Sequence, residues 1–209
     1  MKNITASLVF LIASAAVAGP MGYDSKNPKA PVLPPPAPIP EPSCRISYDF
    51  LEAGYNHVMP DEGSTGQGYY LGFNKSINEN FYGWGHGGQT FNTGWDQVDV
   101  AGGLGVHVPV GRCFDWVTKV GCLYVNGEGE SNWGVVGGTG FRFSVASWLE
   151  INTFYHFSNT FADPTDWREH SGSAALIFKE VLMPRVDTVL AGVYADSGTG
   201  VSLGLRYNF

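Results

Sequence analysis

The last nine residues of the chain, 201–209, alternate without interruption between apolar side chains and polar or glycine positions. Successive side chains of a β-strand point to opposite faces, so this segment has one apolar face and one polar face. The same division recurs over residues 149–157 and 98–108. Alternation with a period of two is typical of strands and does not fit an amphipathic helix.

Turn signals divide residues 44–209 into ten such segments, and most of them are nine residues or longer. That length matches the roughly 9–11 tilted residues that a strand needs to cross an outer membrane. Four prolines of this region, Pro60, Pro109, Pro164 and Pro184, fall between the expected strands. The glycine-rich segment 81–91 has an undetermined register. The expected strands are 46–58, 66–75, 81–91, 96–108, 114–126, 132–144, 148–160, 167–178, 185–195 and 200–209.

The amino terminus reads as an export signal followed by a spacer. Lys2 precedes an apolar run that ends in Ala16-Val17-Ala18, which predicts a cleaved signal peptide over 1–18. The run is shorter than the roughly 20 apolar residues of a transmembrane helix. Residues 28–42 hold eight of the 13 prolines, so 19–43 is expected to be a Pro-rich periplasmic linker. The remaining residues, 44–209, form the folded domain.

Two all-β architectures produce this alternation. A soluble sandwich turns its apolar faces inward, whereas an outer-membrane barrel turns them outward to lipid. Export favours the barrel, and so do tryptophans placed near the strand ends, as membrane interfaces require. Trp95, Trp133 and Trp167 lie at one end of the strands, and Trp116 and Trp148 lie at the other. The predicted fold is an antiparallel up-and-down transmembrane β-barrel of about ten strands, with eight as the alternative.

Isolated charges in the middle of the polar faces also favour a barrel, because in a narrow lumen they would meet and pair. These residues are Glu52, Asp99, Lys119, Arg142, Glu150 and Arg206. About eight strands already give an interior that side chains fill, so ten strands predict a closed lumen rather than an open pore. Seven glycines are expected to face inward and to make room for the cations: Gly83, Gly85, Gly87, Gly103, Gly105, Gly138 and Gly140.

The carboxy-terminal residues, from Ser202 to Phe209, read SLGLRYNF. This segment resembles the assembly signal of bacterial outer-membrane barrels, on the positions Ser202, Gly204, Tyr207 and Phe209. With the opening strand over 47–58, the domain is similar to the small OmpA-like and opacity-type barrel families. The resemblance implies recognition by the barrel assembly machinery and residence in the outer membrane, among lipid and lipopolysaccharide.

The connections after the odd-numbered strands are acidic and contain neither Lys nor Arg. An even number of strands places both termini in the periplasm, so these connections are expected outside the cell. They are either ordinary polar loops or functional. Functional loops would bind divalent cations that bridge lipopolysaccharide phosphates, or would create a negative field that attracts cations to a channel. Their acidic residues are Asp61, Glu62, Glu128, Glu130, Asp163, Asp166 and Asp196.

One motif points to chemistry. His156-Phe-Ser158-Asn159 resembles the His-x-Ser-Asn motif of outer-membrane lipid A deacylases, with Glu169 downstream as an orienting acid. Three features oppose a lipid A-modifying hydrolase. The alternation places His156 and Ser158 in the lumen, the Ala-Gly that usually follows is missing, and two more strands follow the motif. No catalytic residue is therefore assigned, and no enzyme activity is expected.

The three cysteines leave one pairing open. Cys113 and Cys122 are too far apart along one strand to bridge, and Cys122 is expected to face lipid. Cys44 and Cys113 are both expected at the periplasmic end, where a disulfide between them is one of two alternatives. Metal-ligand spacing is absent, so no metal or cofactor is predicted.

Composition completes the functional prediction. A net charge of -7 argues against nucleic acid as a partner, because phosphate binding requires clustered Lys and Arg. The chain is expected to be a monomeric, non-enzymatic outer-membrane barrel, structural or surface-interacting, with a side-chain-filled lumen. The alternatives are a small cation-preferring channel and the hydrolase that would use His156 and Ser158.

Overall fold

The computed structural model describes residues 44, 46–61, 63–92, 96–127, 130–161 and 167–209, all within the compact unit Glu41–Phe209. The signal peptide and the linker predicted over 1–43 lie outside the described residues. Ten strands are present, as the alternation predicts, rather than eight. They are β1 (Phe50–Pro60), β2 (Gly66–Ser76), β3 (Phe81–Phe91), β4 (Asp96–Gly111), β5 (Phe114–Gly127), β6 (Glu130–Ala146), β7 (Leu149–Thr160), β8 (Trp167–Met183), β9 (Val186–Ala195) and β10 (Gly198–Asn208).

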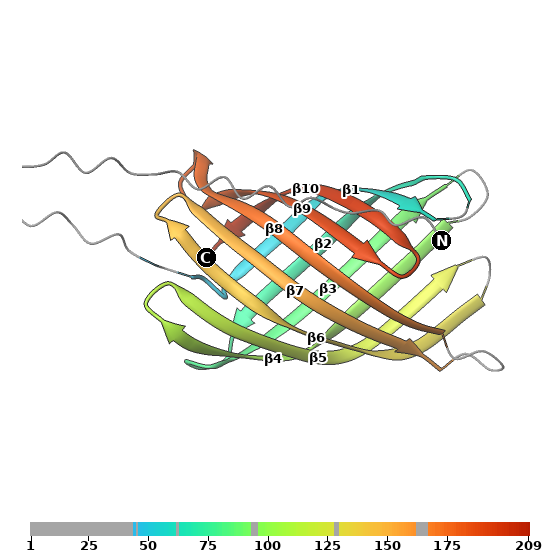
Figure 1. Cartoon of the computed structure of the whole chain (residues 1–209), viewed down its shortest axis with the longest axis horizontal. Coiled ribbons are helices and arrows are strands. Elements are labelled where there is room, and N and C mark those ends of the chain that lie inside the picture. The colour runs from blue at the N-terminus through green and yellow to red at the C-terminus, as the bar shows by residue number, and fades with distance from the viewer. Residues whose placement is uncertain (1–43, 45, 62, 93–95, 128–129, 162–166) are drawn as a thin grey trace, which may run out of the picture. The chain divides into compact units, whose positions relative to one another are not determined.

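The strands form one closed antiparallel barrel. Each strand pairs with its neighbours in sequence, and β1 pairs with β10 to close the sheet. Figure 1 shows the strands tilted across the barrel, with the connections gathered at its two ends. Closure leaves the sheet without a free edge, which is what allows a β-structure to sit in lipid. Among the described residues, no helix is long and apolar enough to cross a membrane.

The apolar face of each strand lies on the outside of the barrel. On β10, Leu203 and Leu205 are 57% and 48% exposed, whereas Arg206 between Leu205 and Tyr207 is 7% exposed and points inside. This arrangement confirms the barrel and rules out the sandwich, in which the leucines would be buried. Trp116, Trp133 and Trp148 are exposed near strand ends, as predicted for a membrane-interface belt. The side chains of Trp95 and Trp167 lie outside the described part of the chain.

Three details at the strand ends correct the sequence prediction. Strand β1 begins at Phe50 and not at residue 46. Pro60 is the last residue of β1, and Pro109 lies inside β4, so neither occupies a connection as predicted. The β4–β5 register shifts between Pro109 and Gly111, and such an irregularity accommodates a residue without an N–H. Pro184 lies in the β8–β9 turn as predicted, and Pro164 lies outside the described residues.

The predicted register of β3 is wrong. Gly83, Gly85 and Gly87 face outward, and the intervening Tyr82 and Trp84 face the lumen, where they are 2% and 6% exposed. Glycine contributes no side chain to the hydrophobic pattern, so alternation alone cannot determine the register of such a strand. The other four glycines expected to face inward do so: Gly103, Gly105, Gly138 and Gly140.

Aromatic side chains in the lumen lie directly over inward glycines. A Cβ atom on Gly105 would collide with the ring of Tyr82, which is buried and has no room to move. We expect Gly105→Ala to lower the free energy of unfolding by about 1–3 kcal/mol, as overpacking does elsewhere. Gly172→Ala is the matched control, because no atom lies within 4 Å of its Cβ position. Equal effects of the two substitutions on urea unfolding in detergent micelles would contradict this packing.

Candidate functional site

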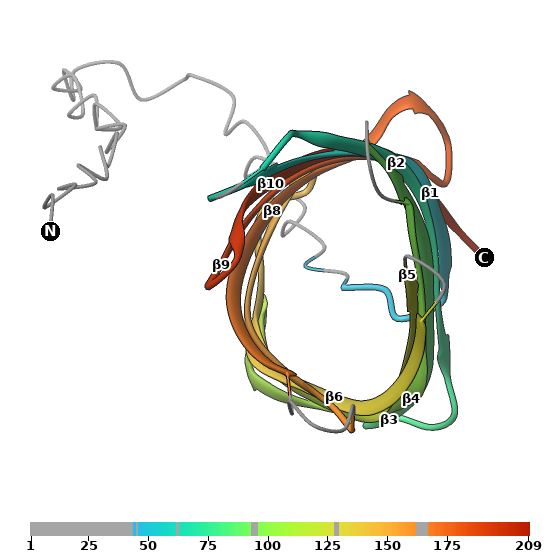
Figure 2. The same ribbon diagram turned by 90° about the vertical axis from the view of Figure 1, so that its right-hand side faces the viewer.

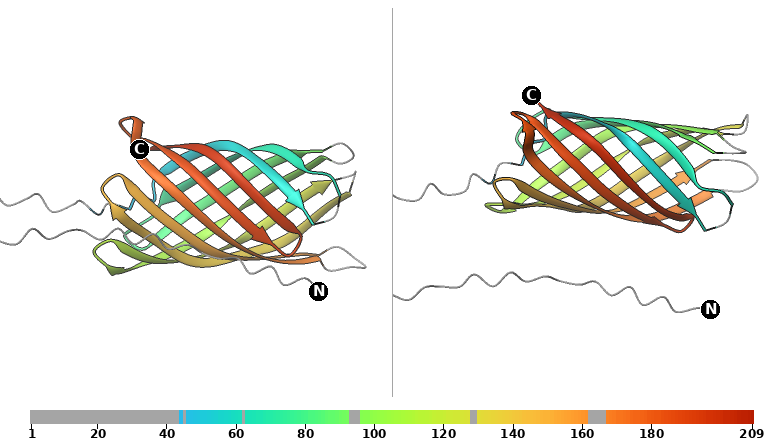
Figure 3. Two further views of the ribbon diagram at one scale, coloured as in Figure 1. Left: turned by 45° about the horizontal axis from the view of Figure 1, so that its top comes forward. Right: turned by 90° about the horizontal axis from the view of Figure 1, so that it is seen from above.

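The residues that precede β1 enter the lumen (Figure 2). We call the end of the barrel that carries residues 44 and 209 and the turns β2–β3, β4–β5, β6–β7 and β8–β9 the terminus end, and the opposite end the loop end. The carboxy terminus marks the terminus end in both views of Figure 3. At the terminus end, residues 46–49 turn into the lumen instead of extending β1, and Figure 2 shows this blue segment inside the ring of strands. We call residues 46–49 the plug segment. Its Tyr48 is buried against Tyr82, Trp84 and Val117.

Tyr48 also makes polar and stacking contacts with the barrel wall. Its hydroxyl donates to Asp115 Oδ2 at 2.9 Å, and its ring stacks on His107 with 3.9 Å between centroids. The Arg142 guanidinium lies 4.5 Å above the same ring, and Arg142 Nη1 donates to the Ser47 carbonyl at 2.8 Å. Burial raises the pKa of the Tyr48 phenol above its ordinary value, so its hydroxyl remains a hydrogen-bond donor.

Asp49 fixes the end of the plug segment. The Ser76 backbone N–H donates to Asp49 Oδ1 at 2.8 Å, and Lys75 Nζ lies 3.2 Å from the same oxygen. Burial acts to raise the pKa of Asp49, but the Ser76 N–H and Lys75 together lower it. The Phe209 N–H donates to the Asp49 carbonyl at 3.2 Å. Asp49 therefore joins the plug segment to the end of β2 and to the carboxy terminus.

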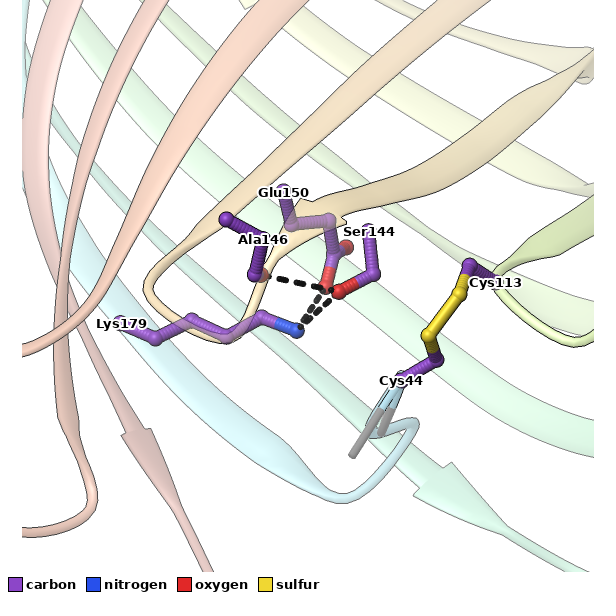
Figure 4. Close-up of a disulfide and its surroundings, with 6 residues drawn as sticks. All are labelled: Cys44, Cys113, Ser144, Ala146, Glu150 and Lys179. Atoms are coloured by element: carbon purple, nitrogen blue, oxygen red, sulfur yellow. Dashed lines mark hydrogen bonds and ion pairs between the residues drawn. A yellow bond between two sulfur atoms is a disulfide. The ribbon is translucent and has the colours of Figure 1, made fainter. Parts of the chain in front are cut away.

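A disulfide provides a covalent anchor just before the plug segment. Cys44 and Cys113 are bonded, with 4.9 Å between their Cα atoms and a sequence separation of 69 (Figure 4). This bond resolves the pairing that the sequence left open, and it attaches the chain to the β4–β5 turn. Cys122 is a free thiol on the exposed outer face of β5, in agreement with its predicted lipid-facing position.

Four of the six charges predicted in the lumen form two separate clusters. Arg142 donates to Glu150 Oε1 at 2.8 Å from Nε and at 2.6 Å from Nη2. Lys179 Nζ lies 3.3 Å from the other oxygen, Glu150 Oε2 (Figure 4). Directly across the β1–β10 pair, Arg206 donates to Glu52 Oε2 at 2.9 and 2.7 Å.

Sequence reasoning missed several members of these clusters. Tyr70 donates to Glu52 Oε1 at 3.0 Å, and Lys179 binds Glu150. The strand expected over 167–178 ends before Lys179, whereas β8 continues to Met183. Extending the expected strand by one residue gives Lys179 the lumen-facing parity of Ile177.

The other two predicted charges lie apart from these clusters. Asp99 Oδ2 is 3.4 Å from His86 Nε2. Lys119 Nζ lies 4.8 Å from the ring centroid of Trp84 and 5.6 Å from that of Phe154. The six residues therefore do not form one network.

The buried charged side chains of the lumen lie toward the terminus end. Glu150 and Arg142, which face the lumen there, are 2% and 4% exposed. Toward the loop end, the lumen-facing side chains of His86 and Val193 are 43% and 40% exposed. Water therefore reaches the part of the lumen on the loop side of the plug segment. We call this part the vestibule, and His86, Lys119, His156 and Val193 line it.

The deacylase-like motif is not assembled as a catalytic group. His156 and Ser158 face the lumen, as the alternation predicts. His156 Nε2 lies 3.1 Å from the hydroxyl of Ser173 on β8. Glu169 accepts a hydrogen bond from Ser197 at 2.6 Å, so it orients a loop residue instead of the histidine. Within the described ranges, no group of three or more His, Cys, Asp or Glu residues could hold a metal ion.

The predicted acidic rim is described only in part. Asp61, Glu130 and Asp196 lie at the loop end, and Asp196 Oδ2 accepts a hydrogen bond from the His170 N–H at 3.1 Å. The other four acidic residues of the prediction, Glu62, Glu128, Asp163 and Asp166, lie outside the described residues.

No protein-family model matches the chain, and neither does any curated protein. Solved barrels are similar to it. The translocator domain of autotransporter NalP from Neisseria meningitidis shares 10% identity over 78% of this chain and 90% of that chain, with a TM-score of 0.48. Ail of Yersinia pestis shares 14% identity over 78% of this chain and 100% of that chain, with a TM-score of 0.39. OprG from Pseudomonas aeruginosa shares 12% identity over 78% of this chain and 96% of that chain, with a TM-score of 0.41. With its sheet closed on itself and its apolar faces turned outward, the chain is an outer-membrane β-barrel protein.

Proposed function

We propose that the protein is a non-enzymatic, non-conducting outer-membrane barrel with a structural or surface-interacting role. The observation that carries the proposal is the plug segment, which fills the lumen at the terminus end. Tyr48 packs in the hydrophobic cluster there, Asp49 binds the end of β2, and the Cys44–Cys113 disulfide anchors the chain that precedes them. A solute that enters at the loop end meets buried side chains before it reaches the other end.

We assign the terminus end to the periplasm and the loop end to the cell surface. Residues 44 and 209 lie at the same end because the barrel has an even number of strands. The acidic residues at the loop end would then bind divalent cations that bridge lipopolysaccharide phosphates. Every strand already has two partners in the closed sheet, so no strand edge is available for assembly and we expect a monomer.

Planar-bilayer recordings of the purified full chain test this proposal. We expect no steady conductance, because the plug segment interrupts the path through the lumen. Steady cation-selective current would overturn the proposal in favour of the small cation-preferring channel. Lipid A from cells that express the protein should show no lost acyl chain in mass spectra. A loss that Ser158→Ala abolishes would establish the hydrolase instead.

The carboxy-terminal motif yields a prediction about assembly. If Ser202, Gly204, Tyr207 and Phe209 are read by the barrel assembly machinery, Phe209→Ala should reduce the folded protein in outer-membrane fractions several-fold. Leu203→Ala is the control, since Leu203 shares the exposed outer face of β10 but occupies a variable position of the motif. Heat-modifiable mobility on gels measures the folded fraction. Equal amounts of the two variants would show that the motif is not read.

A further inference from the structure

Three basic side chains lie in the lumen immediately on the loop side of the hydrophobic cluster around Tyr48. On β3, β5 and β7, the cluster contains Trp84, Val117 and Phe154. Lumen-facing positions are two residues apart along a strand. The next such position toward the loop end is occupied by a basic residue on each of the three strands. We call these residues, His86, Lys119 and His156, the basic ring.

Lys119 and His156 are adjacent. Gly138 lies between them in the sheet, paired with Lys119 on one side and with His156 on the other. The Cβ position of Gly138 is 3.0 Å from His156 Nδ1 and 3.5 Å from Lys119 Cε, so both side chains lie over this glycine. The residue opposite Lys119 on β4 is also a glycine, Gly105. Neither neighbouring strand therefore contributes a side chain that covers the ammonium group directly.

Lys119 differs from the other lumen cations in its partners. Arg142 and Lys179 bind Glu150, and Arg206 binds Glu52. In the part of the chain that the structure describes, Lys119 Nζ has no carboxylate or hydrogen-bond acceptor within bonding distance and contacts only aromatic faces. An ionisable side chain at membrane depth without a counter-ion is costly and marks a functional site.

The basic ring contains one carboxylate contact. Asp99 Oδ2 lies 3.4 Å from His86 Nε2, and Lys119 is not part of this pair. His156 Nε2 is occupied by the Ser173 hydroxyl, at 3.1 Å. When that hydroxyl donates to Nε2, the imidazole proton lies on Nδ1, the nitrogen beside Lys119.

We propose that Lys119 and His156, with His86 at the edge, form a binding site for a small anion at the floor of the vestibule. The ligand class is a small molecule with a carboxylate or phosphate group, which would accept hydrogen bonds from the Lys119 ammonium and from His156 Nδ1. Trp84 and Phe154 hold the lysine in place, and water already reaches His86 from the loop end. The acidic rim disfavours large polyanions at the entrance. The site does not depend on whether the barrel conducts.

Titration calorimetry on the full chain, folded in lipid nanodiscs, tests the site with inorganic phosphate and with acetate as separate probes. We expect saturable binding of at least one probe, at one site per barrel. Lys119→Met should weaken it at least tenfold, because the substitution keeps the apolar stem and removes the charge. Lys119→Arg should retain binding. Lys75→Met, which changes the net charge equally at an exposed position of the terminus end, should also retain it.

His156→Gln provides a second variant if Lys119→Met does not fold, as judged by heat-modifiable mobility, and it should weaken binding several-fold. The proposal is overturned if neither probe binds saturably. It is also overturned if folded Lys119→Met binds the probe as tightly as Lys75→Met does. If Lys119→Met does not fold, the same comparison is made with folded His156→Gln. A conducting barrel that still binds phosphate would contradict the proposed function but not this site, so the two failures are distinguishable.

Discussion

Replacement of Glu150 by glutamine is expected to lower the free energy of unfolding by about 3–5 kcal/mol, the usual cost of breaking a buried ion pair from one side. Glu150 is 2% exposed and accepts two hydrogen bonds from Arg142, with Lys179 3.3 Å from its other oxygen. The substitution removes the negative charge that Arg142 and Lys179 both contact, at a position that is buried in the lumen. Urea unfolding of the protein in lipid or detergent, followed by tryptophan fluorescence, measures the change.

Lys75→Met is the matched comparison for this variant. It breaks the ion pair with Asp49, in which the Lys75 side chain is 61% exposed. Exposed pairs contribute about 0–1 kcal/mol, so a small change is expected. If Glu150→Gln were no more destabilising than Lys75→Met, the Arg142–Glu150–Lys179 cluster would not hold the terminus half of the barrel together.

The double variant Cys44→Ser, Tyr48→Ser is expected to give a steady conductance in planar bilayers where the wild-type protein gives none. The first substitution removes the disulfide to the β4–β5 turn, and the second removes the ring that packs on Tyr82, Trp84 and Val117. The ion pair between Arg142 and Glu150 is retained, so the barrel itself should stay folded.

Cys122→Ser controls for the loss of a cysteine, because Cys122 is a free thiol on the exposed outer face of β5. It should remain silent in bilayers, like the wild-type protein. A double variant that is folded by heat-modifiable mobility but still non-conducting would contradict the assignment of residues 46–49 as the plug.

Most of the fold could be predicted from alternation because membrane-facing and lumen-facing residues differ strongly in polarity. The prediction failed where this contrast is absent. On β3, Gly83, Gly85 and Gly87 carry no side chain to distinguish the two faces, so the register was wrong and Tyr82 and Trp84 were not expected in the lumen. Residues 46–49 have the side-chain types of a strand, and only their packing in the lumen separates them from β1.

The candidate site was harder to predict than the strands. Alternation assigned Glu52, Arg142, Glu150 and Arg206 to the lumen, but it could not give their partners. Pairing depends on the register between strands that are distant in sequence, as for Glu52 and Arg206 across the closing strands. The absence of a carboxylate partner at Lys119 depends on residues of other strands. Gly105 on β4 and Gly138 on β6 pair with Lys119 in the sheet, and neither carries a side chain that could bind it.

The central claim is that the lumen is open at the loop end and sealed at the terminus end. Sided labelling of Val193→Cys in a Cys122→Ser background tests it most directly, because Val193 faces the vestibule and is 40% exposed. A membrane-impermeant maleimide should label this cysteine from the loop end in oriented proteoliposomes and leave it unlabelled from the terminus end. Equal labelling from both ends, or labelling from the terminus end alone, would contradict the account.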